Sequence, residues 1–495
     1  MAAIYLDYAA TTPVDGQVAA RMQPWLGTHF GNAASAHGYG AEAARAIEAA
    51  RAATAALIGA PPRDLVFTSG ATESNNLALF GMARGAAARG RHIVTSAVEH
   101  KSVLDPARRL ERAGFQVQYL RPTRAGTVDP DRLRAALRPD TTLVSLMHAN
   151  NEIGVINDLA ACGAVCRERG VPLHVDAAQS AGKLAIDVAA MNIDLLSLSA
   201  HKFCGPQGVG ALYVRQSLRA VLEPLQFGGG QECGLRSGTL PVHQIVGLGA
   251  AAELAQALCL SEAARVASLR DRLQAGIAAL PGVVVNGGDA ARVPGILNVS
   301  IAGVNGESLV ARLAELALST SAACNADSDE TSYVLRALGR DAELAQASLR
   351  LSLGRFTTER DIDAAIAAVC REVPRLRALA ETPLPGGEGW SSGRAGTRAL
   401  GTEIGWALRW LGDTLAEIRY AAYGGADTLR ACAWLGAKLR GRTRQDAQQG
   451  GPLEWARELS IPDRHLGELL VVEDALRAAL AKGGTGDKMP GAARP

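Results

Sequence analysis

Lys202 is the residue that most readily suggests chemistry. It ends the motif Ser199-Ala200-His201-Lys202 at the close of a strand-like run, and a turn rich in glycine and proline follows at 203–210. Ligands of parallel sheets bind at the carboxyl ends of the strands. A lysine in that place can hold pyridoxal phosphate as a Schiff base, so the motif predicts this cofactor.

Cys324 is the second candidate. It lies in a run of small and polar residues, 319–327, where a thiol can receive a group that the cofactor releases. Because a free thiol with a pKa of about 8.5 is mostly protonated at neutral pH, this cysteine needs activation. We expect His100 to supply it.

Further polar residues follow strand-like runs upstream. Gly70-Ala71-Thr72-Glu73 comes after the run 65–68 and opens a helix, and backbone N–H groups at a helix start suit a phosphate. Asp176 follows the run 173–175, with Gln179 three residues on. A carboxylate there can keep a pyridine nitrogen protonated, although a lone aspartate is also explained as a helix cap.

Two more motifs occupy the same kind of position. His100 follows the run 92–96, and its imidazole can stack on a cofactor ring and move protons, although a lone histidine is more often structural. Asn150-Asn151-Glu152-Ile153-Gly154 follows the run 142–148 and offers an amide to a ring oxygen or a substrate. Together the motifs put groups for phosphate, ring nitrogen, ring face and Schiff base at the ends of successive strands.

Strand-like and helix-like elements alternate along the part of the chain that must position these residues. Short apolar runs recur from 65 to 215, separated by helix-like stretches such as 129–137. This alternation predicts a mainly parallel sheet covered on both faces, in a large domain at 15–255. Helices dominate from 261 to 378, with one strand-like run at 296–301. We assign residues 256–378, together with 1–14, to a small domain.

Composition bounds the class of protein. The 495 residues carry a net charge of +2 and are 48% hydrophobic, which suits buried cores and gives no basic excess for nucleic acid or an anionic membrane. The eight cysteines are irregularly spaced, and Cys162 and Cys166 fit core positions of a helix better than a metal site. Residues 1–13 lack the features of a signal peptide, and no uncharged apolar run reaches membrane-spanning length. We expect a cytoplasmic protein without a metal.

The composition changes after residue 378. Residues 383–396 hold two prolines and five glycines, which predicts a linker at 379–397. Five of the six tryptophans lie at or beyond Trp390, so this last segment is expected to have its own core. The apolar pattern predicts strands at 404–410 and 415–423 and helices at 427–439 and 467–481, before a disordered tail at 482–495.

Long stretches of the chain resemble the cysteine desulfurases of the nitrogen-fixation and iron–sulfur type, in the class V branch of the fold-type I pyridoxal-phosphate enzymes. The resemblance covers about residues 4–377 and rests on the stretches 5–13, 67–75, 150–154, 199–202, 236–241, 332–339 and 349–355. It implies an α/β fold with a large cofactor-binding domain and a small α+β domain.

The resemblance also implies roles for single residues. Lys202 carries the cofactor and then moves the substrate α-proton. Asp176 pairs with the pyridine nitrogen, Gln179 bonds the ring hydroxyl, and His100 stacks on the ring. The phosphate is held by Ala71, Thr72, Ser199 and His201. A threonine of the partner subunit, matched by Thr239, completes that site, which implies a homodimer. Asn151 contacts cofactor and substrate, and Arg350 forks onto the substrate carboxylate.

Cys324 matches the catalytic cysteine of that family. Its thiolate attacks the sulfur of the substrate–cofactor adduct, so that L-cysteine becomes L-alanine and the sulfur stays on Cys324 as a persulfide. An acceptor protein then takes the sulfur for iron–sulfur clusters or other sulfur compounds. Two alternatives stay open: a selenocysteine lyase, distinguished by turnover of both amino acids with and without Cys324, and a non-enzymatic assembly partner, which would be colourless.

The segment 398–481 resembles a degraded copy of the U-type iron–sulfur scaffold, a small α+β domain. The motifs 420–425 and 472–475 carry this second resemblance. Gly425 and Glu468 stand where cluster-binding cysteines would fall, and Cys432 is the only thiol of the segment. One thiol cannot hold a cysteine-ligated cluster. We therefore predict a domain without a cluster, which docks near the Cys324 loop and modulates sulfur delivery or stabilises the dimer.

Overall fold

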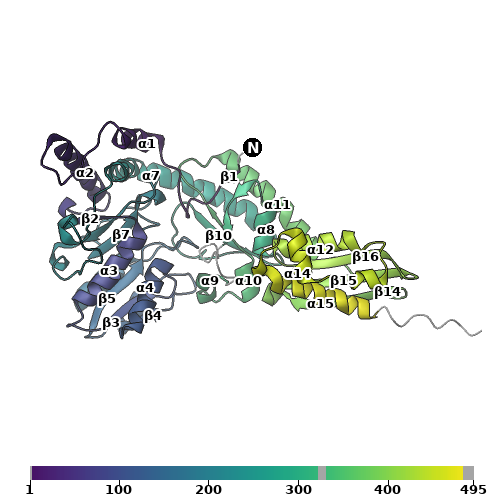
Figure 1. The fold of residues 1–495 in the computed structure, drawn as a ribbon. Coiled ribbons are helices and arrows are strands. Elements are labelled where there is room, and N and C mark those ends of the chain that lie inside the picture. The colour runs from purple at the N-terminus through teal and green to yellow at the C-terminus, as the bar shows by residue number, and fades with distance from the viewer. Residues whose placement is uncertain (1–2, 321–330, 483–495) are drawn as a thin grey trace, which may run out of the picture.

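A seven-stranded sheet forms the large domain of this computed structural model, which describes residues 3–320 and 331–482 (Figure 1). The strand order is β2 (Leu65–Thr68), β8 (Gly210–Val214), β7 (Leu195–Ser199), β6 (Leu173–Asp176), β5 (Thr141–Met147), β3 (His92–Ser96) and β4 (Gln116–Leu120). From β7 to β4 neighbouring strands are parallel, whereas β8 runs antiparallel to both β2 and β7. The predicted mainly parallel sheet is therefore confirmed, with one reversed strand.

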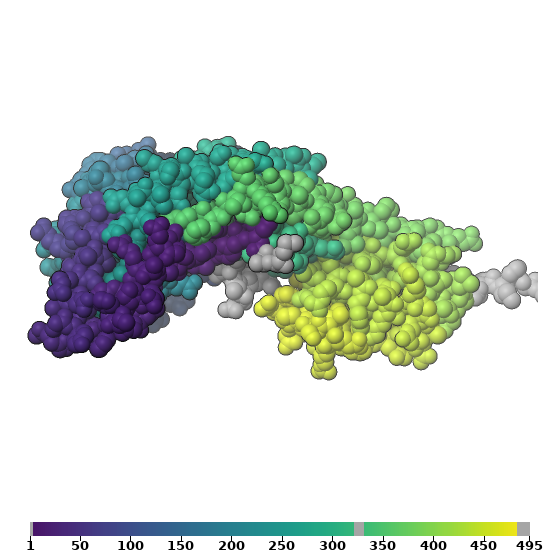
Figure 2. Space-filling view, turned by 90° about the horizontal axis from the view of Figure 1, so that it is seen from above, coloured from purple at the N-terminus to yellow at the C-terminus, as the bar shows by residue number. Residues whose placement is uncertain are grey.

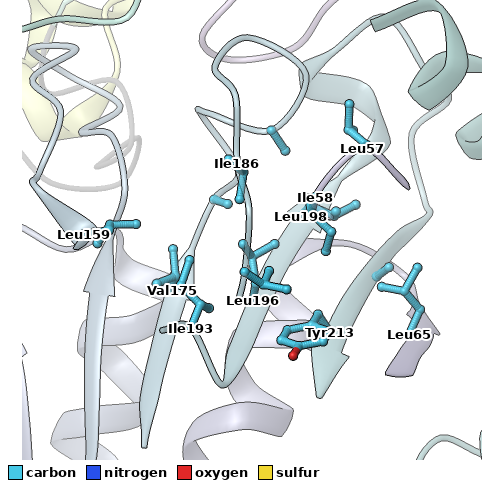
Figure 3. Packing of buried hydrophobic residues seen from close by; sticks show 14 of the residues in the cluster. Leu57, Ile58, Leu65, Leu159, Val175, Ile186, Ile193, Leu196, Leu198 and Tyr213 are labelled. Carbon is cyan, nitrogen blue, oxygen red and sulfur yellow. The ribbon is translucent and has the colours of Figure 1, made fainter. Parts of the chain in front are cut away.

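Helices cover both faces of this sheet, because successive strand residues point to opposite sides. In β7, Leu195 joins a cluster with α3 (Ala71–Gly85) and α4 (Lys101–Arg112). Its neighbour Leu196 joins the cluster that contains α2 (Gly38–Ala56), α6 (Leu159–Arg169) and α7 (Val242–Ala278). Figure 3 shows Leu196 and Leu198 of β7 within that second cluster.

Shorter elements complete the large domain. They are α1 (Gly16–Met22), α5 (Pro130–Ala136) and single 3-10 turns at Gln23–Leu26, Pro62–Asp64, Ala200–Lys202, Gln216–Leu218 and Glu232–Gly234. Cys162 and Cys166 on α6 are buried, and burial raises the pKa of each to about 12. Both are core thiols, as predicted.

The helix α7 connects the large and small domains. Ile245, in the first half of α7, belongs to the core of the large domain. Leu273, in its second half, belongs to the hydrophobic cluster that contains the core of the small domain. Among the described residues, α7 is the one helix long and apolar enough to cross a membrane. It packs against α1, α2 and α11 (Glu359–Ala380), as a helix of the protein core does.

The small domain contains more strands than the sequence predicted. An antiparallel sheet has the order β12 (Ser319–Thr320), β13 (Ser348–Ser352), β10 (Ile296–Ile301) and β9 (Val283–Val285), and β1 (Ile4–Tyr5) pairs with β11 (Leu316–Ala317). Helices α8 (Gly306–Arg312), α10 (Ala342–Gln346) and α11 pack with these strands, and α9 (Tyr333–Ala337) packs against α10. Only β10 was predicted.

The C-terminal part is a three-stranded antiparallel sheet with helices, which we call the appended domain. Its elements are β14 (Trp390–Thr397), β15 (Thr402–Leu411), β16 (Thr414–Tyr423), α12 (Ala426–Leu439), α13 (Arg444–Ala447), α14 (Pro452–Leu459) and α15 (Leu466–Lys482). The two predicted strands and two predicted helices are present. The predicted tail at 482–495 is wrong at Lys482, which ends α15, and its other residues lie outside the described ones.

The predicted linker at 379–397 is wrong over residues 390–397, which form β14. The two glycines inside β14, Gly393 and Gly396, have a packing cause instead. A Cβ atom at Gly393 would lie 2.3 Å from the backbone nitrogen of Ala479 on α15, so glycine lets the helix approach the strand closely. Since α11 continues to Ala380, only residues 381–389 connect the two domains.

The appended domain packs directly on the small domain. One continuous hydrophobic cluster contains Leu309 of α8, Val369 of α11 and Ile418 of β16. Tyr423 donates a hydrogen bond from its hydroxyl to the carbonyl oxygen of Val304 at 3.3 Å, and Ser308 donates to the carbonyl oxygen of Gly424. Figure 2 shows the yellow C-terminal residues lying against the green part of the chain.

Candidate active site

A cavity of about 490 Å³ lies at the carboxyl ends of the parallel strands. Nine of the ten residues predicted to bind the cofactor line it: Ala71, Thr72, His100, Asn151, Asp176, Gln179, Ser199, His201 and Lys202. The tenth, Thr239, is exposed and does not line this cavity. The chain thus brings together the residues that the separate strand-end motifs singled out.

Lys202 is positioned by the end of β7 and by the N-terminal segment. It closes the 3-10 turn at Ala200–Lys202, directly after the strand. Its ammonium donates to the carbonyl oxygens of Ala9, at 2.6 Å, and Ala10, at 2.7 Å. These two residues follow β1, so the segment that leads from the small domain to the large domain holds the lysine at the cavity.

A hydrogen-bonded chain connects Asp176 to His100. Asn75, on α3, donates from Nδ2 to Asp176 Oδ2 at 2.8 Å and to Ser102 Oγ at 2.8 Å. Ser102 Oγ in turn lies 2.8 Å from His100 Nδ1. Asp176 is almost fully buried, and its Oδ1 accepts the N–H of Ala178. The aspartate and the histidine are therefore held in one network by two side chains that the sequence analysis missed.

The protonation of His100 follows from its contacts. Burial lowers its pKa below the ordinary value of 6.5, against the opposing charge of Asp176. Its Nδ1 accepts the backbone N–H of Ser102 at 3.1 Å, as the N-cap of α4. The neutral ring therefore carries its proton on Nε2 and is a donor there.

The start of α3 offers backbone N–H groups to an anion. Gly70 precedes the helix with φ 150°, a conformation that favours glycine, and within the described part of the chain no side chain caps the helix. A Cβ atom at Gly70 would lie 3.4 Å from Ser199 Oγ, so glycine keeps that corner open. Arg236 braces the first turn through Glu73, donating from Nε at 2.8 Å. Uncapped N–H groups and a helix dipole suit an anionic phosphate.

Arg350 lies on β13 at the border of the two domains. It is buried, and its guanidinium donates to Asp7 Oδ1 at 2.8 Å and to the carbonyl oxygen of Asn151 at 3.1 Å. Its Nε has no hydrogen-bond partner among residues 3–320 and 331–482. The predicted substrate arginine thus has donors beside Asn151, which lines the cavity.

Cys324 lies outside the described residues, but both flanking residues are held. Ser319 donates to Asp7 Oδ2 at 2.8 Å and lies opposite Arg350 in the sheet. On the other side, Ser332 caps α9 and donates to the carboxylate of Glu152. Asp7 and Glu152 were not predicted as site residues, although both belong to stretches that carry the resemblance.

The residues present fit pyridoxal phosphate. The uncapped start of α3 suits its phosphate, the buried Asp176 suits a protonated ring nitrogen, and Lys202 is at the strand end where a Schiff base would form. His201, whose pKa burial lowers to about 4, is a neutral hydrogen-bonding group rather than a cation.

Comparison with known proteins identifies the family. The family described as Aminotransferase class-V matches residues 4–365. "Cysteine desulfurase IscS" of Aeromonas hydrophila is 54% identical over 379 residues, which cover 76% of this chain and 94% of that protein. The Salmonella schwarzengrund protein of the same name is also 54% identical, over 380 residues. The chain belongs to the cysteine desulfurases of this family. Its cofactor is pyridoxal phosphate and its substrate is cysteine.

Solved structures agree with this assignment. A "NIFS-LIKE PROTEIN" superposes with a TM-score of 0.71 at 35% identity and covers 75% of this chain and 100% of its own. The structure titled "SspA in complex with cysteine" has a TM-score of 0.64 at 40% identity and covers 72% of this chain and 100% of its own. Both solved structures are therefore matched over their whole length, and the class-V match ends before the appended domain.

Proposed function

We propose that this desulfurase converts L-cysteine to L-alanine and keeps the sulfur as a persulfide on Cys324. The observation that carries the proposal is one cavity lined by Lys202, Asp176, Gln179 and His100. Arg350 donates a hydrogen bond to Asn151, which also lines this cavity. Pyridoxal phosphate, when bound, supplies an electron sink for the substrate carbons. The chain's own residues supply binding, orientation and proton transfer.

We assign these residues the roles that the family resemblance implies, and their common position at the cavity supports the assignment. Ala71, Thr72, Ser199 and His201 would hold the phosphate. Asp176, oriented by Asn75, would hold the ring nitrogen, and Gln179 the ring hydroxyl. His100, neutral and donating from Nε2, would stack on the ring and pass protons. Lys202 would carry the cofactor and move the α-proton. Arg350 and Asn151 would bind the substrate.

The sulfur step balances without an added oxidant. The Cys324 thiolate attacks the substrate sulfur, an S–S bond forms, and the C–S bond breaks. The electron pair of that bond stays with the carbon fragment, which takes up a proton and leaves as L-alanine. The persulfide is then passed to an acceptor protein for iron–sulfur clusters or another sulfur compound. We assign the reaction to the cytoplasm.

A homodimer would complete the phosphate site. Thr239 is exposed and absent from the cavity of its own chain, which supports its use by a neighbouring subunit. Arg236 ties the segment 236–241 to Glu73 at the edge of the cavity. The segment is thereby held at the surface next to the start of α3.

The appended domain is proposed to be a scaffold-like domain that has lost its cluster and modulates sulfur delivery. Cys432 is fully buried, and burial raises its pKa, so it is a core residue. Glu468 accepts a hydrogen bond from Thr428, and its carboxylate lies about 3.0 Å from where a Cβ of Gly425 would be. A cleft of about 270 Å³ is lined by Thr402 and Glu468 of this domain and by Thr320 and Thr331 of the small domain. These two threonines flank the segment that carries Cys324.

Covalent labelling tests the assignment of Lys202. The cofactor-loaded protein is reduced with sodium borohydride, digested and analysed by peptide mass spectrometry. We expect a pyridoxyl group on Lys202 in the native chain and no labelled peptide in Lys202→Ala. A label on another lysine, with Lys202 unmodified, would contradict the proposed function.

A further inference from the structure

Lys183 is a partly buried lysine at the active site to which the proposed reaction assigns no role. It lies in the turns that follow Asp176, and its ammonium donates to Gln179 Oε1 at 3.1 Å. It shares a second, smaller cavity with Lys202, Phe203 and Cys204. Among residues 3–320 and 331–482, no carboxylate forms an ion pair with it.

A lysine in this place is electrostatically unfavourable. Burial and the nearby charge of Lys202 lower the pKa of Lys183 to about 7. The two ammonium groups repel each other, and an apolar side chain of the same length in place of Lys183 would avoid that cost. The lysine is therefore better explained by what it does to its neighbours than by stability.

Its first neighbour is the amide of Gln179. A lysine ammonium has three donors and no acceptor, so the amide oxygen must be the atom that faces it. The amide nitrogen then points the other way and donates to the carbonyl oxygen of Ala9 at 2.8 Å, next to Lys202, which shares that acceptor. Lys183 and the Ala9 carbonyl therefore fix the orientation of the amide together, one from each end.

We propose that Lys183 is a positioning residue, which holds the Gln179 amide with its N–H groups toward the cofactor and places a positive charge beside Lys202. The proposal rests on the roles proposed above for Gln179 and Lys202. A donor to the ring oxygen stabilises that oxygen as an anion. Below its own pKa of about 7, Lys183 is also a cation that disfavours a proton on the nitrogen of the Lys202 linkage. Both effects favour the deprotonated linkage, so they add.

The test is a pH titration of the visible absorption of the cofactor-loaded protein without substrate. Lys183→Met keeps the length of the side chain but removes charge and donor, so we expect its midpoint to rise by roughly half a pH unit or more. Lys183→Arg keeps both and should stay near the native midpoint. Lys482→Met, at the exposed end of α15, is the matched control.

Three outcomes overturn the proposal. They are an unshifted midpoint in Lys183→Met, a shift in Lys183→Arg as large as in Lys183→Met, and a native protein without a visible band. The last would also contradict the proposed role of Lys202, whereas the first two leave that role intact. Lys183→Gln, which removes the charge but stays polar, gives the same readout if the methionine variant does not fold, and an unshifted midpoint there overturns the proposal equally.

Discussion

Ser102 is the residue that connects Asp176, through Asn75, to His100. Its hydroxyl accepts from Asn75, which also holds Asp176, and contacts the Nδ1 atom of His100. A single serine therefore sets the orientation of an amide and an imidazole at once. Because it is buried, water does not readily replace its hydroxyl.

Ser102→Ala should lower kcat for alanine formation by about tenfold. The change leaves the Asn75 amide without an acceptor and His100 without its hydroxyl contact, and such a loss costs about 1–2 kcal/mol. Steady-state alanine formation from L-cysteine measures it. Ser102→Thr keeps the hydroxyl and serves as the control. Equal rates in the native and alanine proteins would show that the network does not position His100.

Arg350→Lys should raise KM for L-cysteine by roughly 10- to 100-fold, because an ammonium cannot fork onto a carboxylate as a guanidinium does. The same alanine assay, run over a range of cysteine concentrations, measures the effect. Arg371→Lys, which changes an exposed arginine on α11, is the control. An unchanged KM in Arg350→Lys would exclude Arg350 as the carboxylate-binding residue.

At the scale of elements, β12 and α9 hold the two sides of the segment that carries Cys324. On each side a serine donates a hydrogen bond to a carboxylate near Arg350: Ser319 donates to Asp7, and Ser332 donates to Glu152. Burial raises the pKa of Glu152 to about 7. The folded protein therefore prefers this carboxyl protonated.

This preference gives a pH-dependent stability. Between the ordinary pKa near 4.5 and the folded value of about 7, the folded state binds more protons than the unfolded state, so stability falls as pH rises through that range. Glu152→Gln removes the titration. We expect the Tm of the native protein minus that of Glu152→Gln to decrease from pH 5 to pH 8. A constant difference over this range would contradict the assignment.

The sequence was informative for elements whose pattern is local. Each strand of the large sheet coincides with an apolar run of the sequence. Site residues such as Lys202 and Asp176 stand at the strand ends that this pattern predicts. The strand β14 was missed, because its glycines exist for contact with α15, which is distant in sequence. Asn75 and Ser102 were missed for the same reason: only the packing of α3 beside α4 brings them together.

At the scale of the whole molecule, the appended domain covers one side of the small domain. The contact includes α8 against α12 and α11 against β16, within one hydrophobic cluster. The shared cleft reaches Thr320 and Thr331, beside the segment with Cys324. Such a contact can restrict which molecules reach the persulfide.

Ser308→Arg should loosen this contact, because Ser308 is buried on α8 and bonds the carbonyl oxygen of Gly424. We expect a small added thiol to release sulfide from the persulfide several-fold faster, with the cofactor absorption unchanged. Ala311→Arg, at an exposed position of the same helix, is the control. Equal sulfide release in all three proteins would remove the proposed modulating role of the appended domain.

The central claim is that this chain is a desulfurase that acts through Cys324. The most direct measurement is alanine and sulfide release from L-cysteine, with a reductant, by the native full-length protein and by Cys324→Ala, both loaded with cofactor. The account predicts steady turnover by the native protein and loss of both products in the variant, with the same cofactor absorption. Equal turnover by the two proteins would contradict it.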